Sequence, residues 1–189
     1  IPTLAIYPFN DSIMFAGGGM SSPVGTGLSK TTDGGVHWSP LGGLGGLTIT
    51  SLVVDTTSLS SGFIVYAGTE NAGVYQSKDG GNSWKIVANN TSMSGSALRI
   101  HSLALAQGPI PILTAGTSSR QYFWITGGLQ WLPFSNGIAD EVSQCTAVVP
   151  DQNGLFEFYV GTKGNEESFA PKPVSGGLYR KSNPLVDTL

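Results

Sequence analysis

The strongest constraint on this chain is a strand ending that recurs four times. Runs rich in β-branched and aromatic residues each end in a small residue followed by glycine, at Gly17, Gly68, Gly116 and Gly161. These glycines follow one another at intervals of 51, 48 and 45 residues. Self-similarity at such a period indicates an array in which each unit buries its apolar face against the next. The 189 residues therefore predict four units of one kind.

A second landmark follows the first in three of the units. Residues 31–38 read Thr-Thr-Asp-Gly-Gly-Val-His-Trp, and residues 77–84 read Ser-Lys-Asp-Gly-Gly-Asn-Ser-Trp. A weaker copy occupies residues 124–131, where Thr126 replaces the aspartate. The fourth unit keeps only Asn183, without the glycine pair and without the tryptophan. We therefore expect the fourth unit to lack its outer strand.

Each unit is predicted to contain four short strands. In the second unit they are expected at 48–54, 63–68, 73–77 and 83–88, where Val, Ile, Tyr, Phe and Thr alternate with turns of Gly, Asn, Asp and Ser. Four antiparallel strands in 40 to 50 residues are typical of one blade of a β-propeller. The predicted fold is all-β, one propeller domain or propeller portion over 1–189, with four four-stranded blades of which the fourth is incomplete. The blades are expected at about 2–46, 47–93, 98–138 and 143–189.

Composition excludes several classes of function. Only 11% of the residues are charged and the net charge is −3, so a basic patch for nucleic acid is not expected. The two longest uncharged stretches, 34–54 and 100–119, carry glycine, proline and histidine and are not apolar enough to span a membrane. The single cysteine, Cys145, rules out an internal disulfide, and its apolar setting predicts a buried thiol. Low charge with abundant Ser, Thr and Gly favours a protein outside the cytoplasm, and a start at Ile1 fits either a removed leader or a piece of a longer chain.

Two copies of the pattern Ser/Thr-x-Asp-x-Gly-x-x-Trp resemble the Asp-box, or BNR, repeat. They are formed by Thr31, Asp33, Gly35 and Trp38 and by Ser77, Asp79, Gly81 and Trp84. The residues of 65–69 and 73–75 also resemble blades of this type. Asp-box repeats occur in sialidases, xyloglucan hydrolases, sortilin-type receptors and photosystem II assembly-factor propellers. The resemblance covers the whole chain as four blades, although the boxes decay along it.

The residue types of the box have a structural explanation. An aspartate side chain accepts hydrogen bonds from nearby backbone N–H groups and stabilises a tight turn, and glycine permits a positive φ there. Tryptophan is a large apolar anchor between blades. We therefore interpret Asp33 and Asp79 as turn residues, not as catalysts or metal ligands. Neither a metal ion nor a cofactor is expected.

Loop lengths separate the two faces of the predicted propeller. The turns that carry the boxes lie on one face. The loops between the second and third strands lie on the other face, at 19–26, 70–72, 118–119 and 163–176, and their lengths run from 2 to 14 residues. Variable loops on a rigid scaffold are where binding residues gather. The candidate binding residues are Met20, Glu70, Asn71, Arg120, Lys163, Glu166, Glu167 and Phe169.

Glu70 is the strongest candidate for catalysis. Residues 69–75 resemble the segment that carries an acidic catalytic residue in xyloglucan-hydrolase blades, which implies that Glu70 would serve as acid or base. Glycosidases need a second carboxylate facing the same bond, and the candidates on this face are Asp140, Glu141, Glu166 and Glu167. The competing interpretation is that Glu70 is a solvated loop residue.

Two functions remain in consideration. The first is a non-catalytic binding or assembly module outside the cytoplasm, which contacts a protein complex through the face opposite the boxes. An open array leaves unpaired edges, so the expected partner is another protein or a second copy that completes the propeller. The alternative is a secreted glycoside hydrolase or carbohydrate-binding propeller that uses Glu70, with Glu166 and Glu167 as further catalytic candidates and a glycan as ligand.

Overall fold

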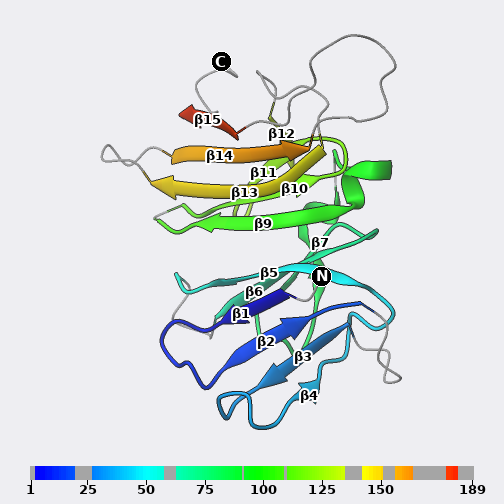
Figure 1. Ribbon diagram of the computed structural model, residues 1–189, viewed down its shortest axis with the longest axis vertical. Coiled ribbons are helices and arrows are strands. Elements are labelled where there is room, and N and C mark those ends of the chain that lie inside the picture. Colours follow the sequence, from blue (N-terminus) through cyan, green and yellow to red (C-terminus); the bar gives the residue numbers. More distant parts are fainter. Residues whose placement is uncertain are drawn as a thin grey trace.

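The computed structural model describes residues 3–19, 27–57, 63–90, 92–108, 110–134, 142–150, 156–163 and 178–182. In these ranges the chain folds into four antiparallel sheets, three with four strands and one with three (Figure 1). This confirms the predicted all-β fold of propeller-type blades, and the described part of the fourth blade has three strands. The described helices are two short 3₁₀ turns, η1 (Val87–Asn90) and η2 (Gly95–Leu98), and neither has the length or the apolar character needed to cross a membrane.

Every sheet is a meander whose strands neighbour one another in chain order. The first sheet contains β1 (Thr3–Ile6), β2 (Met14–Gly17), β3 (Leu28–Thr31) and β4 (Ser39–Pro40). The second contains β5 (Ile49–Asp55), β6 (Ile64–Thr69), β7 (Val74–Ser77) and β8 (Lys85–Ile86). The third contains β9 (Ile100–Ala106), β10 (Ile112–Thr117), β11 (Gln121–Ile125) and β12 (Leu132–Pro133). The fourth contains β13 (Val142–Pro150), β14 (Phe156–Lys163) and β15 (Leu178–Ser182).

The first strand of each sheet packs against the first strand of the next. β1 contacts β5, β5 contacts β9, and β9 contacts β13. The four sheets consequently form a stack, with the first and the fourth at opposite ends (Figure 1). The described strands thus form an open array of blades and not a closed ring.

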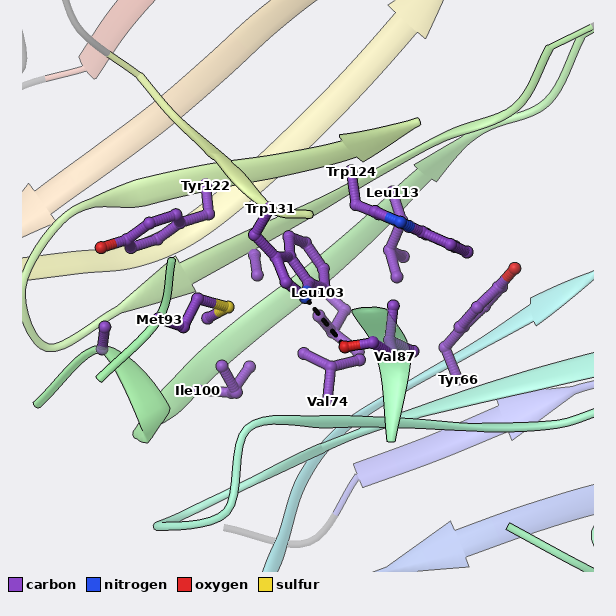
Figure 2. Close-up of a cluster of buried hydrophobic side chains, with 12 residues drawn as sticks. Tyr66, Val74, Val87, Met93, Ile100, Leu103, Leu113, Tyr122, Trp124 and Trp131 are labelled. Atoms are coloured by element: carbon purple, nitrogen blue, oxygen red, sulfur yellow. Dashed lines mark hydrogen bonds between the residues drawn. The ribbon is translucent and has the colours of Figure 1, made fainter. Parts of the chain in front are cut away.

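The core consists of three apolar layers, one between each pair of neighbouring sheets. The middle layer is drawn in Figure 2, where Trp131 donates its indole N–H to the carbonyl oxygen of Val87 at 3.4 Å. The close approach of the sheets explains the repeated glycine. A Cβ added to Gly68 would lie 2.6 Å from Cγ2 of Ile100, and one added to Gly17 would lie 2.6 Å from Cγ2 of Ile49. Any side chain at these positions would push neighbouring blades apart.

Cys145 differs from the expectation, because its thiol is exposed. It shares one side of β13 with Ala147 and Val149, both of which are exposed as well. The fourth sheet ends the described stack, and the described residues provide no further sheet to cover this side. The apolar residues around Cys145 therefore lie on a side of β13 that no described sheet covers. The prediction of a buried thiol is wrong.

Candidate functional site

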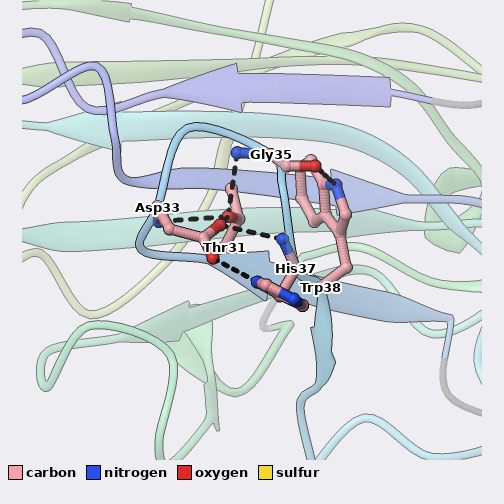
Figure 3. A network of polar contacts seen from close by, with 5 residues as sticks. All are labelled: Thr31, Asp33, Gly35, His37 and Trp38. Carbon is pink, nitrogen blue, oxygen red and sulfur yellow. Dashed lines mark hydrogen bonds and ion pairs between the residues drawn. The ribbon is translucent and has the colours of Figure 1, made fainter.

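The first box forms a closed network of hydrogen bonds in the β3–β4 turn (Figure 3). The Thr31 hydroxyl donates to Oδ1 of Asp33 at 2.8 Å and accepts the backbone N–H of Gly35 at 3.0 Å. Oδ1 of Asp33 also accepts the backbone N–H of His37 at 2.9 Å, and Oδ2 lies 2.7 Å from Nδ1 of the same residue. Gly35 has φ 91°, a conformation that glycine adopts at little cost. The Trp38 indole donates to the carbonyl oxygen of Gly35 at 3.0 Å.

The second box repeats this arrangement in the β7–β8 turn. Ser77 Oγ donates to Oδ1 of Asp79 and accepts the backbone N–H of Gly81, both at 2.7 Å. Ser83 donates its backbone N–H to Oδ1 at 2.9 Å and its hydroxyl to Oδ2 of Asp79 at 2.5 Å. The Trp84 indole donates to the carbonyl oxygen of Gly81 at 3.1 Å. Both oxygens of each aspartate are thus occupied within their own turn.

These contacts also set the acidity of the two aspartates. Hydrogen bonds lower the pKa of Asp33 from 3.8 to about 2, first through the backbone N–H of His37 and then through its ring and the Thr31 hydroxyl. The pKa of Asp79 falls to about 2, first through the Ser83 hydroxyl. A carboxyl group this acidic stays ionised near neutral pH and cannot serve as a general acid there.

The turns between the second and third strands lie on the opposite face of the stack, which we call the hairpin face. In two blades, a threonine at the end of the second strand organises this turn. Thr69 Oγ1 donates to the carbonyl oxygen of Gly73 at 2.8 Å and accepts the backbone N–H of Ala72 at 2.9 Å. Thr117 Oγ1 donates to the carbonyl oxygen of Arg120 at 2.7 Å and accepts its backbone N–H at 3.1 Å. This role of the two threonines was not predicted from the sequence, although each directly follows a landmark glycine.

The described carboxylates separate between the two faces. Glu70 follows β6 on the hairpin face, where its backbone N–H donates to the carbonyl oxygen of Thr48 at 3.0 Å. The other described carboxylates lie in the turns of the box face or at the strand ends beside them: Asp11, Asp33, Asp55, Asp79 and Glu157. Across the ranges that the structure covers, Glu70 is therefore the one carboxylate on its face.

Several predicted site residues cannot be compared with this geometry. Asp140, Glu141, Met20, Glu166, Glu167 and Phe169 lie outside the described residues, and Lys163 ends β14. Asn71 is exposed next to Glu70, and Arg120 is half-buried in the β10–β11 turn. The structure therefore brings Glu70 and Asn71 together in one turn and Arg120 to the corresponding turn of the next blade.

A small polar cavity of about 180 Å³ lies beside the first strands of the second, third and fourth sheets. His101 lines it, and its Nε2 lies 2.8 Å from Oγ of Ser118. Burial lowers the pKa of His101, and the nearby Arg99 lowers it further, so the imidazole is neutral at physiological pH. The other residues that line the cavity are Thr50, Ile100 and Gln144. The described residues offer no group of three or more metal-binding side chains, here or elsewhere.

The fold and its turns define an all-β protein built from β-propeller blades. Solved structures of enzymes share this architecture. The GH74 xyloglucanase from Xanthomonas campestris is 21% identical over 96% of this chain, with a TM-score of 0.64, and the GH74 enzyme from Niastella koreensis is 21% identical over 94%, with a TM-score of 0.65. An ancestral GH74 enzyme is 18% identical over 95% of the chain, with a TM-score of 0.60.

These likenesses cover only part of the enzymes. The chain spans just over a quarter of the length of each of them, from 27% to 28%. No family model and no curated protein sequence matches the chain. At this level of identity, the comparisons show the propeller fold, and the function has to be argued from the site itself.

Proposed function

We propose that the chain is a four-blade portion of a β-propeller that works outside the cytoplasm as a non-catalytic binding or assembly module. Its binding surface is the hairpin face, opposite the Asp-box turns. The internal bonding of the described turns on this face carries this proposal. Glycoside hydrolysis needs two carboxyl groups roughly 5 to 9.5 Å apart. Glu70 is the one described acid on this face, and the candidate partners named from the sequence lie outside the described residues.

The hairpin face is suited to recognition because its described turns are short and internally bonded. Thr69 and Thr117 each make several hydrogen bonds within their turns. Such turns present Glu70, Asn71 and Arg120 on a preorganised surface, which lowers the entropy lost on binding. We expect the partner to be a protein, or a second copy of the chain that covers the open ends of the stack.

The fold supports one alternative. A secreted glycoside hydrolase or carbohydrate-binding propeller would use Glu70 as acid or base, with Glu166 or Glu167 as its partner. The propeller likeness to GH74 enzymes is the observation that favours it.

A hydrolysis assay separates the two functions. Wild-type protein and a Glu70→Gln variant are incubated with xyloglucan, and the release of reducing ends is measured. We expect no release by either protein. Release by the wild type that the Glu70→Gln change abolishes would establish the alternative.

A second experiment asks which face binds. A photoreactive amino acid is placed at Asn71 on the hairpin face or at Asn82 on the box face, both of which are exposed. The proposal predicts crosslinks to one defined partner from position 71 and none from position 82, and loss of the crosslink in an Arg120→Ala variant. The reverse pattern would overturn the assignment of the face.

A further inference from the structure

A second recess lies on the face that carries the box turns, between the second and third sheets. It is a pocket of about 470 Å³, which falls in the range of small-molecule sites. The residues that line it and carry the argument are Asp55, Tyr66, Gln76, Lys78, Pro111 and Trp124. Figure 2 shows Tyr66 and Trp124 at one margin of the middle core layer, with the Tyr66 hydroxyl directed away from the other side chains drawn.

The corresponding space between the first and second sheets is filled. Phe63, which stands five residues before Gly68, stacks on Tyr7 with ring centroids 4.4 Å apart. Phe63 also packs edge to face against Phe15, with ring centroids 5.8 Å apart. Nζ of Lys30 lies 5.8 Å from the ring centroid of Phe63. One aromatic ring thus occupies the gap between these blades.

The space between the third and fourth sheets is filled in the same way. Phe156 stands five residues before Gly161 and packs against the apolar layer that contains Ala106 and Phe123. At the interface between the second and third sheets, the equivalent position five residues before Gly116 is Pro111. The smaller ring of proline leaves the pocket open.

The wall of the pocket changes together with its filling. In the second sheet Asp55 pairs with Ile64, and in the first sheet the equivalent position is held by Tyr7, which follows β1. Tyr66 is likewise the equivalent of Phe15, because each stands two residues before the landmark glycine of its blade. Gln76 lies opposite Tyr66 as Lys30 lies opposite Phe15. One of the three interfaces therefore combines an open space with polar groups.

Two of these groups are buried and have spare hydrogen-bonding capacity. Tyr66 is 1% exposed, and no other described residue bonds its hydroxyl. Asp55 is 2% exposed, and its Oδ1 accepts the backbone N–H and the hydroxyl of Thr57 at 2.9 and 2.7 Å. Within the described ranges, Oδ2 of Asp55 receives no bond. Both residues line the pocket, so a ligand there can bond these oxygens.

The ionisation of these groups limits the ligand. Burial raises the pKa of Tyr66, and the negative charge of Asp55 raises it further, so the phenol stays protonated and can donate. Lys78 is exposed at the pocket and contributes a positive charge, while the Gln76 amide can both donate and accept. The lining therefore offers donors and acceptors with one charge of each sign.

We propose that this pocket binds a neutral polyhydroxylated ring, such as one sugar residue of a glycan. Each hydroxyl of such a ring both donates and accepts, which matches Asp55, Tyr66, Gln76 and Lys78, and its carbon–hydrogen face suits the apolar surface of Trp124. A phosphate would face Asp55, and a free ammonium would face Lys78. The site is separate from the hairpin face and does not depend on the function proposed there.

Saturation-transfer difference NMR tests the site with D-glucose, D-galactose and D-xylose as probes. We expect at least one of these sugars to bind. Tyr66→Phe should weaken that binding about tenfold, because it deletes one buried hydrogen bond and keeps the ring. Pro111→Phe should abolish it, because it supplies the ring that Phe63 supplies one blade earlier. Tyr122→Phe is the matched control, since Tyr122 is buried in the same core layer but does not line the pocket, and should leave binding unchanged.

The remaining outcomes overturn the proposal. Binding that survives Tyr66→Phe and Pro111→Phe, or that falls in Glu70→Gln instead, would move the sugar to another surface. A preference for arginine methyl ester or inorganic phosphate over all three sugars would mean that the pocket recognises a charged group. No binding of any probe by a wild-type protein with a cooperative melting transition would remove the site.

Discussion

Nζ of Lys30 in the first sheet donates a hydrogen bond to the carbonyl oxygen of Gly80 in the second sheet, at 2.9 Å. The same ammonium lies 5.5 Å from the ring centroid of Phe15 and 5.8 Å from that of Phe63. Gly80 belongs to the second box turn, so a single side chain ties the turn of one blade to the preceding blade.

We expect Lys30→Met to lower the free energy of unfolding by about 1–2 kcal/mol, because it removes a charge-assisted hydrogen bond and two cation–π contacts but keeps the aliphatic stem. Urea denaturation measures the change. Lys85→Met is the control, because Lys85 is exposed and its ammonium makes no hydrogen bond, ion pair or cation–π contact with the other described residues. Equal effects of the two substitutions would mean that the Lys30 contacts contribute nothing.

The hydroxyl groups of the second box should differ in importance. Ser77 is 1% exposed, and its Oγ serves both Asp79 and the backbone N–H of Gly81. Ser77→Ala leaves that buried N–H without a partner, so we expect a loss of about 1–3 kcal/mol in the free energy of unfolding. Ser83→Ala removes an exposed hydroxyl and should cost less. A larger loss for Ser83→Ala would contradict this account of the turn.

The box aspartates also predict how stability depends on pH. The pKa values of Asp33 and Asp79 fall from 3.8 to about 2 in the folded protein. A depressed folded pKa contributes stability that is complete above the unfolded value and is lost as pH falls through the folded value. We therefore expect unfolding to become easier between about pH 4 and pH 2. Urea midpoints measured across this window should fall less steeply in Asp79→Asn than in the wild type, and parallel curves would refute the assignment.

The order and number of the blades could be predicted because their signals are local and repeated. Gly68 marks the place where the second strand approaches Ile100 of the next sheet. Asp79 and Gly81 are needed for one turn and recur at the same spacing. The turn is imposed by backbone geometry within a few residues, and the glycine recurs at the same place in every unit, so both can be recognised in a single sequence.

Features that depend on two blades at once were not predictable in the same way. The pocket arises because Pro111 stands where Phe63 and Phe156 stand in other units, and only the alignment of the interfaces makes that substitution meaningful. The apolar neighbours of Cys145 predict a buried thiol, but burial requires a covering sheet, which no local pattern predicts.

The tryptophans that end the boxes should contribute to the stability of the fold in proportion to their burial. Trp131, from the weakened third box, is fully buried between the second and third sheets, whereas Trp38 in the first sheet is 40% exposed. We expect Trp131→Ala to cost about 3–5 kcal/mol and Trp38→Ala about 1 kcal/mol. Thermal denaturation of the two variants provides the comparison, and similar losses would show that position in the stack does not determine the role of this residue.

The open end of the stack predicts self-association or capture of another chain. Leu4 and Ile6 of β1 are 57% and 48% exposed on the uncovered side of the first sheet. Apolar side chains gathered on a sheet face favour association, because contact removes them from water. We expect light scattering to give a mass above that of one 189-residue chain.

A double substitution of Leu4 and Ile6 by lysine should shift this mass towards the monomer, because two charges would have to be buried in the contact. Ile110→Lys is the control. Ile110 is 61% exposed, but it lies in the β9–β10 turn of the third sheet, away from the open end. A wild-type protein that stays monomeric at high concentration, with Leu4 and Ile6 freely exposed, would contradict the prediction. An equal shift in Ile110→Lys would place the contact elsewhere.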